Sequence, residues 1–303
     1  MNTNFYEKLI TVIPKERVLI DEPMRKYTTF RIGGPADYLV SVCDMREVKD
    51  VVAVCKAEHV PYYIVGNGSN LLVSDKGYRG VIIRIFKDMA EIEVRENRIV
   101  AKAGALLSQI AAKALEAGLT GFEFAAGIPG TLGGACRMNA GAYGGEMKDV
   151  LEEVVVLDDQ GEIRCLSAGE LELGYRTSVI AKKGYTALEA TISLKKGEKE
   201  KIKEYMEELR EKRVSKQPLE YPSAGSTFKR PEGYFAGKLI QDAGLKGFSV
   251  GDAQVSEKHC GFVINKGNAS AAEVHELMRQ VSDKVEEKFG VRLEPEVRRL
   301  GEF

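Results

Sequence analysis

The chain has 303 residues, of which 44% are hydrophobic and 29% are charged, and its formal net charge is −1. A chain of this length exceeds one typical hydrophobic core, so we expect two or three lobes. The balanced charge excludes a general attraction to nucleic acid or to anionic membranes, and no apolar run approaches the roughly 20 residues that a membrane helix needs.

The cysteines and histidines indicate neither disulfide bonds nor a metal site. The cysteines are odd in number, widely spaced and without a C-x-x-C pair: Cys43, Cys55, Cys136, Cys165 and Cys260. They predict reduced thiols in a cytoplasmic protein. The histidines, His59, His259 and His275, have no ligand-like spacing with cysteine or carboxylate, so we expect no metal.

Periodic patterns along the chain predict a mixture of helices and strands. Strands are expected at 37–42, 62–65, 81–85, 92–94, 98–103, 154–157, 163–166, 186–194 and 262–265. Helices are expected at 45–59, 105–118, 199–216 and 271–289, the last one beginning with the capping box Ser270-Ala-Ala-Glu273. Asp158-Asp-Gln-Gly161 predicts a hairpin. This mixed spacing indicates α+β lobes.

A first glycine loop, Gly66-Asn-Gly-Ser-Asn-Leu71, follows the apolar strand predicted at 62–65. A Rossmann turn would need a third glycine and a following helix, but this loop lacks the glycine and enters the apolar run Leu71-Leu-Val73. Two interpretations stay open, an ordinary turn and a loop that donates hydrogen bonds to a phosphate.

A second glycine-rich stretch covers residues 127–144, with glycine at six of eighteen positions. Glycine lets backbone N–H groups approach a phosphate without a Cβ in the way, so the stretch predicts a pyrophosphate cradle. Its composition predicts an irregular backbone without helix or strand. The alternative is a turn-rich connection between sheet elements.

The charged helix within 197–217 marks the clearest boundary, because Glu and Lys dominate it and predict a solvated connector. Residues 221–289 have helices and an apolar strand of their own and predict a small separate lobe. The tail 291–303 returns after that lobe.

Six motifs occur in an order that resembles the UDP-N-acetylenolpyruvoylglucosamine reductase family. They are Tyr27-Thr-Thr-Phe-Arg-Ile-Gly-Gly-Pro-Ala36, the 66–72 loop, the 127–144 stretch, Tyr175-Arg-Thr-Ser178, Ala224-Gly-Ser-Thr-Phe-Lys-Arg-Pro231 and Leu293-Glu-Pro-Glu-Val-Arg298. The resemblance implies an α+β chain with a two-lobe FAD-binding fold of the vanillyl-alcohol-oxidase (PCMH) type and a smaller C-terminal α+β substrate-binding domain. It implies FAD-binding lobes at 1–85, joined by the tail 292–303, and at 86–197, with the substrate-binding domain and its connector helix at 198–291.

The same resemblance implies an NADPH-dependent reduction of UDP-N-acetylglucosamine enolpyruvate to UDP-N-acetylmuramate for peptidoglycan synthesis. Hydride would come from flavin N5 to the methylene carbon, which leaves a carbanion with enolate character beside the carboxylate. We expect non-covalent FAD, because residues 66–74 contain no histidine or cysteine that could tether it. We also expect a monomer of the shorter family type, which lacks a tyrosine-bearing loop.

Three residues match the family's catalytic positions. Arg176 would bind the carboxylate bidentately, and Ser226 would donate the proton to the neighbouring carbon. Glu296 would stabilise the enolate, although residue chemistry alone does not choose between it and Glu294. The structural alternatives are a salt bridge for Arg176, a turn cap for Ser226 and an ion pair with Arg298 or Arg299 for Glu296.

The remaining site residues are expected on FAD or on the substrate. For FAD the resemblance implies Gly66, Asn67, Gly68, Ser69, Asn70, Leu71, Gly127, Gly130, Gly133, Gly134, Ala135, Asn139, Gly141 and Tyr143, with Asn139 and Tyr143 either reaching the flavin or positioning the loop. For the substrate it implies Lys229 and Arg230 at the diphosphate and His259 near the nucleotide. Some relatives have Asn where Arg230 stands.

Two other functions compete with this one. A flavoprotein oxidase of the same fold would hold its FAD covalently, which the absence of a tether in 66–74 disfavours. A nucleotide-sugar-binding regulator would have lost the chemistry, which the presence of Arg176, Ser226 and Glu296 disfavours.

Overall fold

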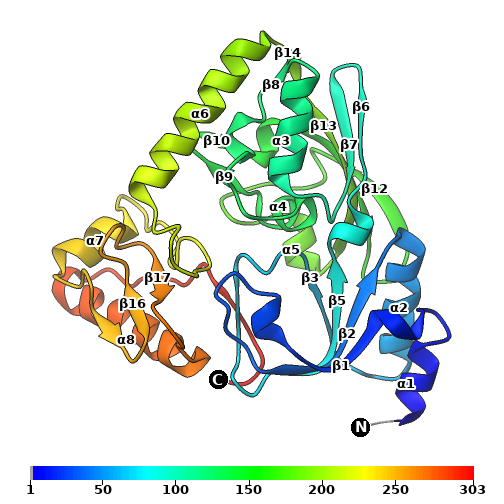
Figure 1. The fold of residues 1–303 in the computed structure, drawn as a ribbon, viewed down its shortest axis with the longest axis horizontal. Coiled ribbons are helices and arrows are strands. Elements are labelled where there is room, and N and C mark those ends of the chain that lie inside the picture. The colour runs from blue at the N-terminus through cyan, green and yellow to red at the C-terminus, as the bar shows by residue number, and fades with distance from the viewer. Residues whose placement is uncertain (1–2) are drawn as a thin grey trace. The chain divides into compact units, whose positions relative to one another are not determined.

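The computed structural model describes residues 3–303, which form two compact units (Figure 1). Unit 1 comprises the chain up to Leu19 together with Tyr38–Asn67 and Gly80–Lys212. Unit 2 comprises Ile20–Asp37, Gly68–Arg79 and Arg213–Phe303. The predicted lobe boundaries at residues 85 and 197 stay predictions.

The first sheet has the strand order β1 (Val18–Pro23), β2 (Pro35–Val42), β5 (Tyr78–Ile85) and β3 (Tyr62–Val65). β3 and β5 are parallel, with Tyr62 opposite Val81. Within unit 1, apolar residues of β3 and β5 share a core with α1 (Thr3–Leu9) and α2 (Met45–Ala57). The end of β3, where the first glycine loop begins, is therefore held in a fixed position.

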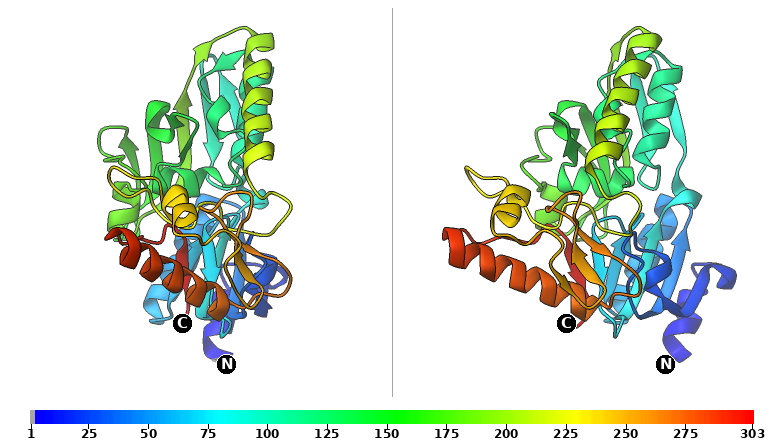
Figure 2. Two further views of the ribbon diagram at one scale, coloured as in Figure 1. Left: turned by 90° about the vertical axis from the view of Figure 1, so that its left-hand side faces the viewer. Right: turned by 60° about the vertical axis from the view of Figure 1, so that its left-hand side comes forward.

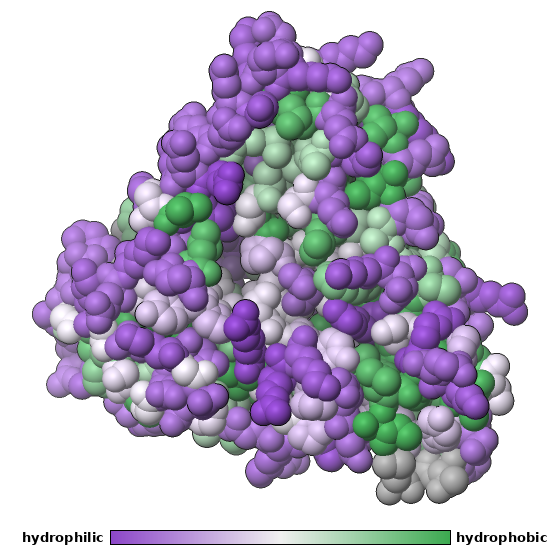
Figure 3. All heavy atoms as spheres, in the orientation of Figure 1, coloured by the Kyte–Doolittle hydropathy of each residue, from purple (hydrophilic) through white to green (hydrophobic). Residues whose placement is uncertain are grey.

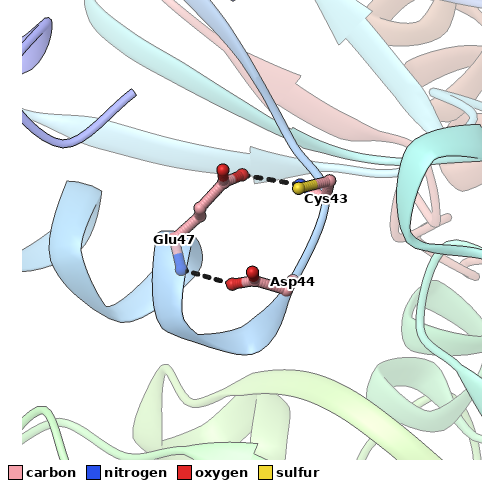
Figure 4. Close-up of side chains that lie close together, drawn as sticks. All are labelled: Cys43, Asp44 and Glu47. Atoms are coloured by element: carbon pink, nitrogen blue, oxygen red, sulfur yellow. Dashed lines mark hydrogen bonds between the residues drawn. The ribbon is translucent and has the colours of Figure 1, made fainter. Parts of the chain in front are cut away.

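The start of α2 brings three potential metal ligands together, Cys43, Asp44 and Glu47 (Figure 4). Asp44 caps the helix by accepting a hydrogen bond from Glu47 N (2.8 Å), and the Glu47 carboxylate accepts one from Cys43 N (2.8 Å). Glu47 also forms an ion pair with Arg17. Burial raises the pKa of the Cys43 thiol, which disfavours the thiolate a metal would bind. Helix capping accounts for this cluster.

The second sheet lies in unit 1 and is antiparallel throughout. Its order is β12 (Ile163–Ser167), β11 (Leu151–Leu157), β13 (Thr186–Ser193), β7 (Arg98–Lys102) and β6 (Ile92–Arg95). Leu157 lies opposite Ile163, which confirms the hairpin predicted at 158–161. α3 (Leu107–Glu116) and α4 (Leu132–Met138) pack against this sheet and share its core.

The prediction that residues 127–144 contain no helix or strand is wrong. The stretch contains α4 and the short strand β9 (Gly141–Ala142), which pairs with β10 (Gly145–Glu146) just after it. Two backbone bonds hold the helix start, Leu132 N to Ala105 O (2.9 Å) and Gly133 N to Ala103 O (2.8 Å). A Cβ on Gly133 would lie 2.9 Å from Ala103 Cβ, so glycine permits this close approach. Tertiary packing overrides the low helix propensity here.

The charged helix α6 (Lys199–Lys216) has the residues predicted for it. Among them only Ile202 and Leu209 are buried, and Figure 3 shows a hydrophilic surface along this helix. A helix with so narrow an apolar stripe is mostly solvated, as its composition predicts.

Unit 2 contains the antiparallel sheet β15 (Ser249–Val250), β16 (Ala253–Val255) and β17 (Val263–Asn265). α8 (Ala271–Phe289) packs against β15 and β16 and against α7 (Ala236–Asp242) (Figure 2). The predicted capping box is present, with Ser270 Oγ accepting from Glu273 N (3.1 Å) and Ser270 N donating to Glu273 (2.9 Å).

The C-terminal tail also pairs within unit 2. β18 (Arg298–Leu300) is parallel to β4 (Leu71–Val73), with Arg298 opposite Leu71. β4 follows the first glycine loop directly, which confirms that this loop is not a Rossmann turn, because no helix follows it. The pairing places the motif around Glu296 beside the first glycine loop.

The remaining elements are short: η1 (Lys15–Arg17), η2 (Met24–Lys26), η3 (Lys87–Met89), β8 (Leu119–Thr120), η4 (Glu123–Ala125), η5 (Met147–Asp149), α5 (Val179–Lys183) and β14 (Lys195–Lys196). None of the short helices α1, α5 and α7 was expected, because seven residues or fewer give little periodic signal. Across residues 3–303, no helix combines the length and apolarity needed to cross a membrane.

Candidate functional site

The two glycine-rich segments meet within unit 1. A Cβ on Gly66 would collide with the hydroxyl of Thr131, the residue that precedes α4. Asn67 Nδ2 donates a 2.6 Å hydrogen bond to Pro129 O. Gly66 and Asn67 of the first loop are therefore in contact with the segment that leads into α4.

The rest of the first loop belongs to unit 2. Gly68 has a φ of +61°, and a Cβ there would collide with Tyr27 O, so only glycine fits. Gly68 O also accepts a hydrogen bond from Thr29 N (3.3 Å). The first and second motifs thus pack together, while Ser69 is half-buried and Leu71 begins β4.

Among the second-loop residues, the structure gives some a packing role. The N–H of Gly133 is bonded to Ala103 O, and Ala135 N donates to Thr131 O (2.9 Å) inside the first turn of α4. Gly130 O accepts a hydrogen bond from Leu107 N (3.1 Å). A Cβ on Gly134 would have only Thr131 Oγ1 nearby, at 3.7 Å, so Gly134 leaves space beside it. Gly127 lies in the exposed approach to this turn.

Asn139 is fully buried at the C-terminal end of α4, with a left-handed φ of +46°. Its amide donates to Glu146 Oε2 (2.9 Å) and Gly174 O (3.1 Å), and its Oδ1 accepts from Lys148 N (2.9 Å). Of the two roles left open for Asn139, these contacts support loop positioning. Tyr143 lies at the exposed tip between β9 and β10 with a φ of +52°.

We expect Asn139→Gly to destabilise the protein by about 1 to 3 kcal/mol, because the three hydrogen bonds of the fully buried Asn139 side chain are lost. Glycine adopts the left-handed backbone freely, so this change isolates the loss of the amide from backbone strain. Urea unfolding measures the effect. A wild-type free energy of unfolding in this variant would mean that the amide contributes nothing to holding the loop.

Arg176 occupies the tip of a tight turn in unit 1. Gly174 and Thr177 exchange backbone hydrogen bonds of 3.1 and 3.2 Å, and Arg176 has a φ of +55°. Ser178 Oγ anchors the turn by donating to Arg137 O (2.6 Å). The Arg176 guanidinium lies 5.2 Å from the centre of the Tyr175 ring, and its Nη2 lies 3.5 Å from Gly141 O. Arg176 is thus held beside the second glycine-rich stretch.

Within unit 2, the buried residue Thr227 joins the backbone segments that carry Ser226 and Glu296. Thr227 O accepts a 2.8 Å hydrogen bond from Glu296 N, and Phe228 pairs with Pro295 as an antiparallel bridge. Gly225, with a φ of +75°, forms the turn that leaves the Ser226 side chain exposed. Thr227 was not singled out from the sequence, although it lies inside a quoted motif.

The two glutamates of the last motif have different surroundings. Glu294 is exposed and pairs with Lys229 Nζ (2.9 Å), which lowers the pKa of Glu294. Glu296 is half-buried. The Arg230 guanidinium lies 4.0 Å from the centre of the Phe235 ring. Lys229 is therefore engaged with a carboxylate, while Arg230 lies on an exposed aromatic ring.

His259 is half-buried and has a local contact. Its Nδ1 accepts a 3.0 Å hydrogen bond from Gly261 N, and its ring meets Phe262 edge-on at 5.1 Å. Burial lowers the pKa of His259, so the neutral ring with its proton on Nε2 fits these contacts. Gly261 O in turn accepts from Thr227 N (2.8 Å), which connects this turn to the segment of Ser226.

Family models match two parts of the chain. The model described as "UDP-N-acetylenolpyruvoylglucosamine reductase, C-terminal domain" matches residues 217–300, and the model described as "FAD binding domain" matches residues 36–167. A UDP-N-acetylenolpyruvoylglucosamine reductase of Agathobacter rectalis is 56% identical over the full length of both chains. One of Alkaliphilus oremlandii is 53% identical over 98% of each chain. The chain belongs to the UDP-N-acetylenolpyruvoylglucosamine reductase family.

Solved structures agree with the family. The crystal structure of UDP-N-acetylenolpyruvylglucosamine reductase from Thermus caldophilus has a TM-score of 0.80 at 38% identity and covers 94% of this chain and 98% of that one. A Phl p 4 variant described as a glucose oxidase has a TM-score of 0.52 at 13% identity, covering 64% of this chain and 44% of that one, so its likeness concerns the fold alone. These findings confirm the resemblance, and the predicted two-lobe FAD-binding fold with a C-terminal domain.

Proposed function

We propose that this chain catalyses the NADPH-dependent reduction of UDP-N-acetylglucosamine enolpyruvate to UDP-N-acetylmuramate, a step of peptidoglycan precursor synthesis. Family membership makes it an FAD-dependent oxidoreductase. When bound, FAD transfers hydride from NADPH to the methylene carbon of the enolpyruvyl group. The roles of individual residues belong to the same proposal.

The observation that carries this proposal is the 2.8 Å hydrogen bond from Glu296 N to Thr227 O, beside Ser226. It places a hydroxyl and a carboxyl, the two groups the family motifs implicate in proton chemistry, on neighbouring backbone segments. Hydride addition leaves negative charge on the carbon beside the carboxylate and on the carboxylate itself. A proton donor and a hydrogen-bonding group are what this charge requires.

Ser226 would hold its proton on Oγ and donate it to the carbon beside the carboxylate. A serine is a weak acid, but a carbanion is a far stronger base than an alkoxide, so the transfer is downhill. The φ of +75° at Gly225 and the exposure of Ser226 support this role, because they present the hydroxyl away from the core of unit 2.

Arg176 would bind the substrate carboxylate through its planar guanidinium. Glu296 would stabilise the enolate character that hydride addition creates. The Ser178 and Asn139 bonds to Arg137 O and Gly174 O support the first role, because they fix the turn that carries Arg176. The exposed Lys229–Glu294 pair favours Glu296 over Glu294 for the second role.

The glycine-rich loops fit a dinucleotide. Gly66 packs on Thr131 and Asn67 donates to Pro129 O, so the start of the first loop contacts the second glycine-rich stretch. Residues 66–69 and 127–135 would hold the FAD pyrophosphate, with Gly134 leaving room for close approach. Residues 66–74 offer no histidine or cysteine, which supports non-covalent FAD. We also propose that the protein is a cytoplasmic monomer. Its substrate contacts would include Lys229, Arg230 and His259.

We expect the purified protein to be yellow and to release its FAD into the supernatant on acid precipitation. Anaerobic NADPH should bleach the visible absorbance of the flavin, and the enolpyruvyl substrate should restore it. Colour retained in the precipitate would indicate a covalent oxidase. Bleaching without restoration by the substrate would indicate a regulator or a different oxidant.

A further inference from the structure

We propose that Asn70 is a positioning residue that links the first glycine loop to Glu296. This inference rests on the proposed role of Glu296 and adds a function for the Asn70 side chain. Asn70 Nδ2 donates a 3.2 Å hydrogen bond to Glu296 O, over a sequence separation of 226 residues. All the contacts that carry the inference lie within unit 2.

The backbone around Asn70 makes the same connection. Asn70 O accepts a hydrogen bond from Arg298 N (3.0 Å), and the next residue, Leu71, lies opposite Arg298 in the parallel β4–β18 pair. The side-chain bond therefore extends a strand pairing by one contact towards Glu296. A register set by the paired strands keeps the amide and the Glu296 carbonyl within reach.

The other side of Glu296 is held by a buried residue. Glu296 N donates to Thr227 O (2.8 Å), and Thr227 is only 1% exposed. Thr227 is anchored in turn, because its N donates to Gly261 O (2.8 Å) and its Oγ1 accepts from Val263 N (2.8 Å).

Glu296 thus has its N–H and its C=O both fixed. These two bonds determine the orientation of the Cα–Cβ bond of Glu296 and hence the direction in which its side chain leaves the backbone. Thr227 contributes through its backbone carbonyl, which no substitution of its side chain removes. Asn70 contributes through its side chain, so a point mutation can release this half of the clamp.

The competing role for Asn70 is direct contact with the FAD pyrophosphate. The two roles differ in what they control, because a phosphate contact affects FAD affinity and a positioning contact affects the reaction that uses Glu296. A double-mutant cycle between Asn70→Ala and Glu296→Gln separates them. The measured rate is the reoxidation of NADPH-reduced enzyme by the enolpyruvyl substrate in anaerobic stopped flow.

We expect Asn70→Ala to slow reoxidation by about 10- to 10²-fold, since small displacements of a reacting group have effects of this size. In the Glu296→Gln background the same change should have almost no further effect. The pH profile of reoxidation in Asn70→Ala should move towards that of Glu296→Gln. FAD retention and the rate of bleaching by NADPH should stay near wild type.

Asn67→Ala is the matched control, because it removes an amide of the same loop that bonds to Pro129 O instead. It should change FAD retention and show no coupling to Glu296. If Asn70→Ala fails to fold, Asn70→Asp repeats the test with the same side-chain shape and no donor.

Two results would overturn the inference while the proposed function stands. One is that Glu296→Gln is slow and that Asn70→Ala slows reoxidation by the same factor in the wild-type and Glu296→Gln backgrounds. The other is that Asn70→Ala lowers FAD retention and leaves the reoxidation rate unchanged. A wild-type reoxidation rate in Glu296→Gln would instead refute the proposed role of Glu296, and the inference with it.

Discussion

Ser226→Ala is expected to bleach with NADPH at a near wild-type rate and to reoxidise with the enolpyruvyl substrate about 10²- to 10⁴-fold more slowly, the usual loss for a positioned acid. The reason is that only the second half-reaction delivers a proton to substrate carbon. Anaerobic stopped-flow absorbance measures both halves in one enzyme preparation.

The structure also supplies controls for this experiment. Ser226 is exposed and follows a glycine turn, so its replacement leaves the buried neighbours Ala224 and Thr227 in place. Ser226→Cys carries a proton on a similarly short side chain and should recover part of the rate. Equal slowing of both half-reactions would assign Ser226 to folding or to the FAD loop. Slowing of neither would mean that another group is the acid.

Arg176→Glu is expected to lower kcat/KM by at least about 10³-fold, because it replaces the cation that binds the substrate carboxylate with a like charge. FAD content should not change. Steady-state kinetics with the enolpyruvyl substrate measures the loss, and flavin absorbance per protein measures the cofactor.

Arg176→Lys is the matched variant for this site. Both replacements carry a Cβ into the same left-handed backbone, with a φ of +55°, so both keep the conformational strain of the wild type. Lysine keeps the charge but not the planar bidentate donor, so we expect a smaller loss than for glutamate. Near-normal turnover of Arg176→Glu with unchanged flavin would make the arginine structural, as an anchor of the turn near Gly141.

Much of the site could be predicted from the sequence because its residues lie in compact motifs. Arg176, Ser226 and Glu296 were found as members of three short segments, and the family assignment from those segments is confirmed. Their relation was not predictable, since the bond between Glu296 N and Thr227 O joins residues 69 positions apart with no periodic pattern. The same holds for the bond between Asn70 and Glu296.

Asn139 illustrates a related limit. A glycine-rich stretch indicates that the backbone closely approaches either a ligand or another segment of the protein. Its composition does not distinguish the two. The structure shows that part of the approach is internal, with Gly133 on Ala103 and the Asn139 amide on Gly174 O and Glu146.

The sequence by itself determined the long helices α6 and α8, most strands of both large sheets and the family. It did so because side-chain periodicity, helix caps and local motifs are encoded within a few neighbouring residues. Only the tertiary structure decided that α4 forms inside the glycine-rich stretch and that Thr227 and Asn70 hold the backbone of Glu296. These outcomes depend on contacts between segments distant in the chain, where packing and hydrogen-bond satisfaction outweigh local propensity.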